Sequence, residues 1–223
     1  MSEVVFPFRD RTEAGRLLAE KLREYADRSD VVVLALPRGG VPVGYEIARA
    51  LNAPLDVFVV RKLGVPGHEE LAMGAIASGG VQVLNQDVLG LGIPKEVVDL
   101  VAAREQRELE RREREYRDGH GSVDVRGRTV ILVDDGLATG SSMRVAAMAL
   151  KKKQPAEIVV AVPVGSPETC AEFESVVDKV VCAVTPEPFW AVGQWYRDFS
   201  QTSDEEVRDL LSRAASLTAG GAA

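Results

Sequence analysis

The sequence predicts an α/β protein with a mainly parallel sheet covered by helices on both faces. Runs of aliphatic residues alternate with stretches of helical spacing, and the runs cover 31–36, 55–60, 130–133, 157–164 and 177–184. Continuous hydrophobicity indicates strands buried on both faces, and strand–helix alternation favours parallel pairing. We expect a single domain over 1–213 of the 223 residues, with its core at 12–184, a small hood at 185–200 and a flexible tail at 214–223.

Composition argues against several classes of protein. The net charge is −7 and the isoelectric point about 5.1, so a nucleic-acid backbone would be repelled and we expect no nucleic-acid partner. The chain shows no signal-peptide pattern and no apolar run near the roughly 18 residues of a membrane span, so we expect no membrane partner. Cys170 and Cys182 lack metal-ligand spacing and are too few for a disulfide framework, which predicts reduced thiols in a cytoplasmic protein.

The first strand ends in a turn that suits an anion. An amphipathic helix over 11–28, with Thr12 as its N-cap, precedes this strand. After the strand comes Pro-Arg-Gly-Gly, in which Arg38 offers a guanidinium fork and Gly39 and Gly40 offer backbone amides. The same four residues also form ordinary tight turns, so a ligand site and a plain turn both remain open.

Two cations follow the second strand. Arg61 and Lys62 come directly after 55–60, and ligands bind at the carboxyl ends of strands in open parallel sheets. Strand-end cations are also often only solvated. The next residues, 63–71, contain Gly and Pro and predict an exposed, flexible loop. Its titratable members are His68, Glu69 and Glu70.

A hairpin and a long helix fill the middle of the chain. Residues 72–77 and 81–84, separated by Ser-Gly-Gly, predict a pair of short strands. A helix from Pro94 to about Arg117 interleaves Arg and Glu in its second half. Such a helix binds nucleic acid or a partner, or it exposes a solvated face of ion pairs. The near-balanced charge favours the solvated face.

The stretch that carries most chemistry is 130–142, VILVDDGLATGSS. A buried strand ends in Asp134 and Asp135, and small residues then lead into a helix. Amides at a helix N-terminus bind phosphate, whereas carboxylates accept hydrogen bonds from sugar hydroxyls or hold the water shell of a metal. The pattern therefore predicts a phosphorylated-sugar site. Its phosphate cradle comprises Ala138, Thr139, Gly140, Ser141 and Ser142.

Aromatic side chains gather after the last strand. Aromatics are only 5% of the chain, yet many of them lie within 185–200. Their rings can stack on a planar base or form a small satellite core, and both interpretations remain open. A final helix over 203–211 has Ser203 and Glu206 in the positions of a capping box.

These motifs together resemble the type I phosphoribosyltransferases. The stretch 130–142 resembles their diphosphoribosyl-binding signature and departs from it at Gly136, where those enzymes usually carry an aliphatic residue. The resemblance implies that 37–40 binds pyrophosphate, that 63–71 closes over the reacting centre, and that the hood contacts the base. The hood residues that match, loosely, are Phe189, Trp190, Val192 and Asp198.

The resemblance implies transfer of the phosphoribosyl group of 5-phosphoribosyl diphosphate to a nitrogenous base or similar nitrogen acceptor, with release of pyrophosphate. Arg38 and Lys62 would stabilise the leaving group. Mg²⁺ would be held mainly by the substrate. The carboxylates near it would be Asp134, Asp135 and Asp198. A homodimer is expected from the family, with the long charged helix as a candidate interface.

One position limits the assignment of a substrate. Ala138 stands where 6-oxopurine enzymes carry an Asp that acts on the purine ring, so the hypoxanthine/guanine mechanism is not implied. Over nearly its whole length the chain resembles a bacterial group of predicted phosphoribosyltransferases whose acceptor is undefined. Two alternatives remain: a regulatory protein that senses 5-phosphoribosyl diphosphate without chemistry, and a hydrolase that uses water as the acceptor.

Overall fold

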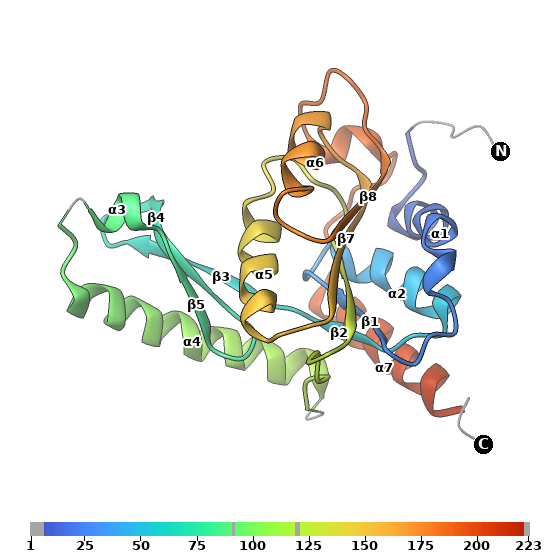
Figure 1. Cartoon of the computed structure of the whole chain (residues 1–223), viewed down its shortest axis with the longest axis horizontal. Helices are drawn as coiled ribbons and strands as arrows, with labels where there is room; N and C mark the ends of the chain where they lie inside the picture. The colour runs from blue at the N-terminus through green and yellow to red at the C-terminus, as the bar shows by residue number, and fades with distance from the viewer. Residues whose placement is uncertain (1–6, 91, 119–120, 221–223) are drawn as a thin grey trace.

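A parallel sheet forms the centre of the protein in a computed structural model that describes residues 7–90, 92–118 and 121–220. Within these residues the sheet has the strand order β2-β1-β6-β7-β8. Its strands are β1 (Val31–Ala35), β2 (Leu55–Val57), β6 (Thr129–Val133), β7 (Glu157–Val164) and β8 (Lys179–Val184). Figure 1 shows helices on both faces of this sheet, which confirms the predicted α/β fold.

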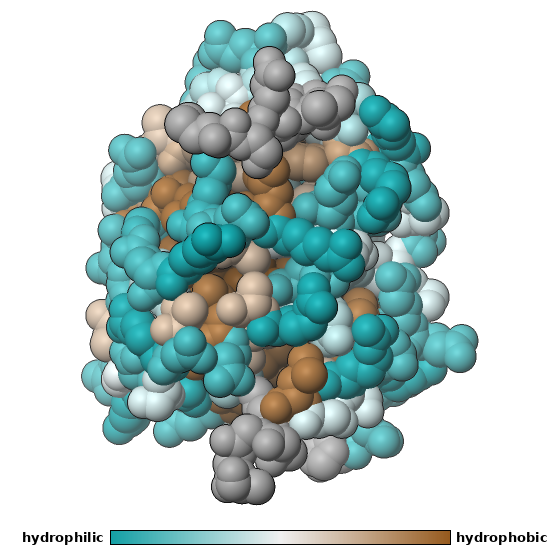
Figure 2. Space-filling model, turned by 90° about the vertical axis from the view of Figure 1, so that its right-hand side faces the viewer, coloured by the Kyte–Doolittle hydropathy of each residue, from teal (hydrophilic) through white to brown (hydrophobic). Residues whose placement is uncertain are grey.

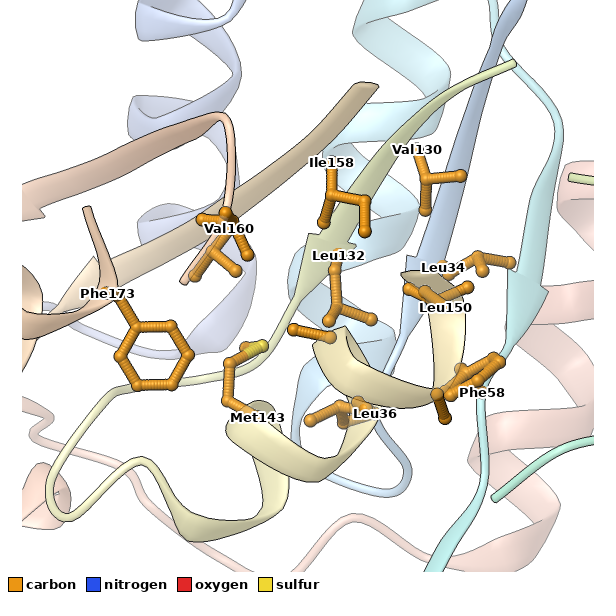
Figure 3. Packing of buried hydrophobic residues seen from close by; sticks show 14 of the residues in the cluster. Leu34, Leu36, Phe58, Val130, Leu132, Met143, Leu150, Ile158, Val160 and Phe173 are labelled. Carbon is orange, nitrogen blue, oxygen red and sulfur yellow. The ribbon is translucent and has the colours of Figure 1, made fainter. Parts of the chain in front are cut away.

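Alternating side chains divide the core between the two faces of the sheet. On one face, Val32 and Leu34 pack with Leu150 of α5, as Figure 3 shows in part. On the other face, Val31 and Val33 pack against α1 and α2. Because both faces of the sheet are covered, most positions of these strands carry apolar side chains. The covering helices are α1 (Arg11–Lys21), α2 (Gly40–Leu51), α5 (Ser141–Lys152) and α6 (Pro167–Phe173), with a 3₁₀ turn at Arg23–Tyr25.

An antiparallel sheet corrects two predictions. It consists of β3 (Val60–Val65), β4 (His68–Ala77) and β5 (Val81–Leu84). Arg61 and Lys62 lie inside β3, and 63–71 forms the turn end of the β3–β4 hairpin instead of a loop. The physical reason is that Leu63 and Met73, both fully buried, pack in one core with α4 (Lys95–Arg117). The predicted pairing of 72–77 with 81–84 is confirmed.

Two further long helices complete the fold. Helix α4 (Lys95–Arg117) lies against β3 and β4, whereas α7 (Asp204–Gly220) packs on α2 and α4. The short α3 (Gln86–Leu89) precedes them. The solvated face of α4 is confirmed by ion pairs such as Arg111 with Glu108, at 2.8 Å. The predicted flexible tail at 214–223 is helical up to Gly220, because Ala214 is buried in the core shared with α4. Residues 221–223 lie outside the described residues.

Helix caps are predicted with mixed success. The backbone amide of Glu206 donates to Ser203 Oγ at 3.0 Å, as expected at the start of α7. In α1 the cap is Asp10 and not Thr12, since Asp10 Oδ1 accepts from the amide of Glu13 at 2.8 Å.

Figure 2 shows the face that carries α1, on which hydrophilic residues predominate and hydrophobic ones show between them.

The two cysteines are also placed differently from the prediction. Cys170 of α6 and Cys182 of β8 form a disulfide, so the expectation of two reduced thiols is wrong. Strand β8 returns beside the end of α6, and the spacing of 12 positions along the chain does not show that approach. No helix among residues 7–90, 92–118 and 121–220 is long and apolar enough to cross a membrane.

The core under α5 should contribute strongly to stability. We expect Leu150→Ala to lower the free energy of unfolding by about 2–5 kcal/mol, because Leu150 is fully buried against the sheet. Leu100→Ala on α4 is the matched control: its side chain is 73% exposed, and the change should cost about 0.5 kcal/mol or less. Urea unfolding measures both, and equal losses would contradict the packing described here.

Candidate active site

Two turns meet at the carboxyl edge of the parallel sheet. β1 and β6 pair in register, with Ala35 opposite Val133, so the turns that follow them lie side by side. A Cβ on Gly39 would lie 2.1 Å from Oδ2 of Asp135, and a Cβ on Gly40 would lie 2.7 Å from the carbonyl oxygen of Val133. Neither space admits a side chain. The contact between the turn and the acids therefore requires glycine at both positions.

The acids lie where ionisation is costly. Asp134 Oδ1 accepts a hydrogen bond from the backbone amide of Asp135 at 2.9 Å, and both residues are half-buried. Burial raises the pKa of Asp134 well above its ordinary value, and the charge of Asp135 raises it further. Burial also raises the pKa of Asp135, while the guanidinium of Arg11 opposes that rise. Perturbed acids of this kind cluster at functional sites.

Arg11 belongs to the site although the sequence gives no sign of it. Its Nε lies 2.8 Å from Oδ2 of Asp135, and its side chain is 11% exposed. A cation in the first turn of an amphipathic helix is usually solvated, and the two residues are 124 positions apart. Tyr196, also outside the predicted site, donates from its hydroxyl to the backbone carbonyl of Asp135 at 2.6 Å.

The predicted phosphate cradle forms the entry to α5. Helix α5 begins at Ser141, so the amides of its first turn face the preceding turn. Gly140 is the N-cap and has a φ of 67°, a conformation that glycine adopts without strain. The hydroxyl oxygens of Thr139 and Ser141 lie 3.2 Å apart, and Ser142 is exposed beside them. Amides and hydroxyls thus gather at one helix N-terminus, as an anion site requires.

Helix α6 supports the cradle from behind. The hydroxyl of Thr169 donates to the carbonyl of Ala138 at 2.6 Å. A Cβ on Gly140 would lie 2.5 Å from Cε2 of Phe173. Neither Thr169 nor Phe173 was predicted as part of the site, because they come from a separate helix. Because the carbonyl of Ala138 already accepts this hydrogen bond, Ala138 contributes to the cradle by fixing the shape of the turn.

Arg38 lies in the other turn, near the start of α7. The Pro37–Arg38 peptide bond is cis. Arg38 is one-third exposed, and its guanidinium lies 3.9 Å from Oδ1 of Asp204. The same oxygen accepts a hydrogen bond from the hydroxyl of Tyr116 at 2.7 Å. The predicted pyrophosphate turn therefore presents a partly exposed cation next to the amide of Gly39. The amide of Gly40, predicted as a second donor, is engaged within the turn, because it donates to the carbonyl of Leu36 at 3.0 Å.

Several predicted site residues lie elsewhere. The guanidinium of Arg61 pairs with Glu105 of α4 at 2.6 Å, and Lys62 is exposed on β3. His68, Glu69 and Glu70 are exposed at the start of β4. Figure 1 shows the antiparallel sheet extending to one side of the parallel sheet. These five residues therefore lie in the antiparallel sheet and not in the turns at the edge of the parallel sheet.

The hood explains the departure of the signature at Gly136. A Cβ on Gly136 would lie 2.4 Å from Cγ1 of Val192, so an aliphatic group from the hood occupies the space beside this position. Phe189 stacks on Trp195 with ring centroids 6.4 Å apart, whereas Trp190 is 77% exposed. The aromatic cluster is thus partly a satellite core and partly an exposed surface.

Metal donors at the site are few. Among the described residues, no three or more His, Cys, Asp or Glu side chains group as a metal site would need. Asp134 and Asp135 offer adjacent carboxylate oxygens, the ligand type that Mg²⁺ and its water shell prefer. Asp198 is exposed, and its carboxylate accepts from the amide of Ser200 at 2.9 Å, which lowers the pKa of Asp198.

Comparisons with known proteins agree with this geometry. A family model described as a phosphoribosyl transferase domain matches residues 10–199. A protein named provisionally as a phosphoribosyl transferase in two strains of Mycobacterium tuberculosis is 48% identical over 208 residues. That match covers 93% of this chain and 47% of the relative, so the chain spans about half the relative's length.

A solved structure is also similar. The crystal structure of TT1426 from Thermus thermophilus has a TM-score of 0.81 and 43% sequence identity, and the match covers 92% of this chain and 98% of that one. The fold, the paired turns and these matches agree. This chain belongs to the phosphoribosyl transferase domain family.

Proposed function

We propose that the chain binds 5-phosphoribosyl diphosphate with Mg²⁺, transfers the phosphoribosyl group to a nitrogen acceptor, and releases pyrophosphate. The observation that carries this proposal is the contact of Gly39 with Asp135, which puts an anion-binding turn against a pair of hydroxyl-binding acids. The cradle at 138–142 follows the same acids along the chain. A sugar with a phosphate at each end matches these three parts.

Each part of the site suits one part of this substrate. The Arg38 fork and the amide of Gly39 suit pyrophosphate, with Gly40 allowing the close approach of the turn to Val133. The acids suit the ribose hydroxyls, and the cradle suits the 5′-phosphate. In the reaction the bond from the anomeric carbon to pyrophosphate breaks, and its electron pair leaves with pyrophosphate. The acceptor nitrogen forms the new bond and loses a proton. Negative charge grows on pyrophosphate, so Arg38 acts mainly in the transition state.

The donor set at the acids fits Mg²⁺ held mainly by the substrate. Arg11 is the cation that pairs with Asp135, so two carboxylates share one positive charge. A divalent cation with its water shell would offset the remaining negative charge. When bound, Mg²⁺ would supply charge neutralisation to the leaving group. Asp134 and Asp135 would hold the ribose hydroxyls and this water shell in place.

The hood supplies the proposed acceptor site. Trp190 offers an exposed ring for stacking on a planar base, and Asp198 offers a carboxylate that can accept from a base N–H. Val192 forms the wall over Gly136. Lys62 and the hairpin residues would join the site only through a movement of the antiparallel sheet, so we assign them no role. A cytoplasmic homodimer is proposed from the family resemblance, and light scattering tests the dimer.

Pyrophosphate release tests the reaction. With 5-phosphoribosyl diphosphate, Mg²⁺ and a panel of purines, pyrimidines and small nitrogen compounds, we expect release that requires an acceptor. It should fall by about 10²-fold or more in Asp134→Asn/Asp135→Asn, because the ribose contacts are lost. Asp30→Asn, before β1 and away from the acids, is the control and should keep activity. Release without an acceptor would indicate a hydrolase, and binding without release would indicate a sensor; both contradict the transferase.

The two anion turns should differ in their kinetic effects. Thr139→Ala should raise KM by about tenfold with little change in kcat, because the charge on the 5′-phosphate hardly changes during the reaction. Arg38→Gln should lower kcat by about 10²-fold, since it removes a cation from the developing charge. Steady-state kinetics distinguish the two, and equal losses of kcat would rule out this division of roles.

The pH dependence of stability tests the environment of Asp134. Its raised pKa means that the folded protein holds this proton more tightly than the unfolded chain does. Stability therefore falls as the pH rises from the unfolded pKa, about 3.9, through the raised value, and stays lower above it. Asp134→Asn removes this penalty and keeps an oxygen to accept from Asp135. The Tm of this variant minus that of wild type should be larger at about pH 8 than at about pH 4.

Asp30→Asn provides a control with the opposite sign. A hydrogen bond from Arg28 lowers the pKa of Asp30, so this carboxylate stabilises the fold above its unfolded pKa. At the higher pH the Tm of Asp30→Asn should be lower than that of wild type. Calorimetric scans at both pH values measure the two variants, and the same pH trend in both would show that the burial of Asp134 is misjudged.

A further inference from the structure

The N-terminal segment and the hood form one unit beside the acids. The amide of Phe8 donates to the carbonyl of Trp195 at 2.8 Å, and the amide of Arg197 donates to the carbonyl of Phe8 at 2.7 Å. The amide of Asp198 donates to the carbonyl of Arg9 at 2.9 Å. These strand-like hydrogen bonds bring the start of α1 against the hood. The first residue of that helix is Arg11.

Arg11 touches the hood and the acids at the same time. Its Nε contacts Asp135, and its Nη1 donates to the carbonyl of Ser200 at 2.7 Å. Its guanidinium carbon lies 4.1 Å from the ring centroid of Phe199 and 6.0 Å from that of Tyr196. A single planar cation thus joins a carboxylate, a hood carbonyl and a hood ring.

We propose that Arg11 is a positioning residue that ties the hood to Asp135, so that the acceptor pocket and the ribose site are assembled together. This inference rests on the proposed function, because the pocket and the site are those of the transfer reaction. Arg11 acts through Asp135 and the hood. It fixes where the carboxylate points, and it holds the segment at 185–200 at a set place relative to the sugar.

The chemistry of the guanidinium makes arginine specific here. Its donors lie in one plane, so one edge can meet Asp135 while another meets the carbonyl of Ser200. Its flat face can lie on the ring of Phe199. A lysine ammonium in this place would keep the charge but not the stacking or the paired direction of the donors. Loss of the cation would leave a partly buried carboxylate unpaired, which is the costly outcome for such pairs.

The hood carries its own reporter for a test. Trp190 and Trp195 are the two tryptophans of the chain, and both lie within the hood. Tryptophan emission therefore reports on the hood alone. Arg16→Gln is the matched control, because Arg16 lies on the same helix, is 57% exposed and pairs with Glu46 instead. Arg11→Lys tests whether charge without planar geometry is enough.

We expect Arg11→Gln to shift tryptophan emission to the red, as the half-buried Trp195 becomes more exposed to solvent. The dissociation constant for 5-phosphoribosyl diphosphate with Mg²⁺ should rise about tenfold or more. Arg11→Lys should recover part of each effect, and Arg16→Gln should match wild type.

A ligand-free double-mutant cycle separates this inference from the proposed function. If Arg11 acts through Asp135, the emission shifts of Arg11→Gln and Asp135→Asn should not add in the double variant. Additive shifts, or an Arg11→Gln emission identical to that of Arg16→Gln, would overturn the inference. Failure of the wild type to bind 5-phosphoribosyl diphosphate would refute the proposed function, while the cycle would still decide the role of Arg11.

Discussion

The in-register pairing of β1 with β6 is the constraint on which the site depends. It places the turn after Leu36 against the turn after Val133, and the amide of Leu36 donates to the carbonyl of Val133 at 2.8 Å. There is no room between these two turns for a Cβ, and the two residues after Arg38 are accordingly both glycine. A one-residue slip in register would turn each strand's side chains to the opposite face of the sheet, so the buried core on both faces holds this alignment.

The position of the acids at this edge lowers the stability of the folded protein. Two carboxylates that are adjacent in the chain lie where burial opposes their ionisation, and the pKa of each is raised. Arg11 offsets part of that cost by pairing with the carboxylate of Asp135, and the hydroxyl of Tyr196 holds the backbone carbonyl of the same residue. Both come from outside the turns, from the N-terminal helix and from the hood. The hood therefore supports the acids indirectly, because Tyr196 holds the backbone of Asp135 and Ser200 accepts a hydrogen bond from Arg11.

Much of this architecture could be read from the sequence because the relevant signals are local. The aliphatic runs before Arg38 and Asp134 are long and continuous, and the strands and the turns after them are where the pattern predicts. Gly39, Gly40 and Gly140 were predicted to lie in the two turns that bind anions, and the structure shows which atoms lie close to them.

The remaining features depend on contacts between distant segments. The strand predicted over 55–60 divides into β2 and β3 because Leu63 and Met73 are buried against α4. No local sequence pattern indicates this contact. Arg11 resembles any cation at the start of a surface helix until the fold brings Asp135 beside it. The unusual Gly136 makes sense only with Val192 over it. The Cys170–Cys182 disulfide likewise follows from the return of β8 beside α6.

A crystal structure with 5-phosphoribosyl diphosphate and Mg²⁺ would test the central claim most directly. We predict pyrophosphate at the turn of Gly39 and Gly40 beside Arg38, ribose hydroxyls on Asp134 and Asp135, and the 5′-phosphate in the turn at 138–142. Density for the ligand with its phosphates away from both turns, or with its ribose out of reach of the two acids, would contradict the assignment of this site.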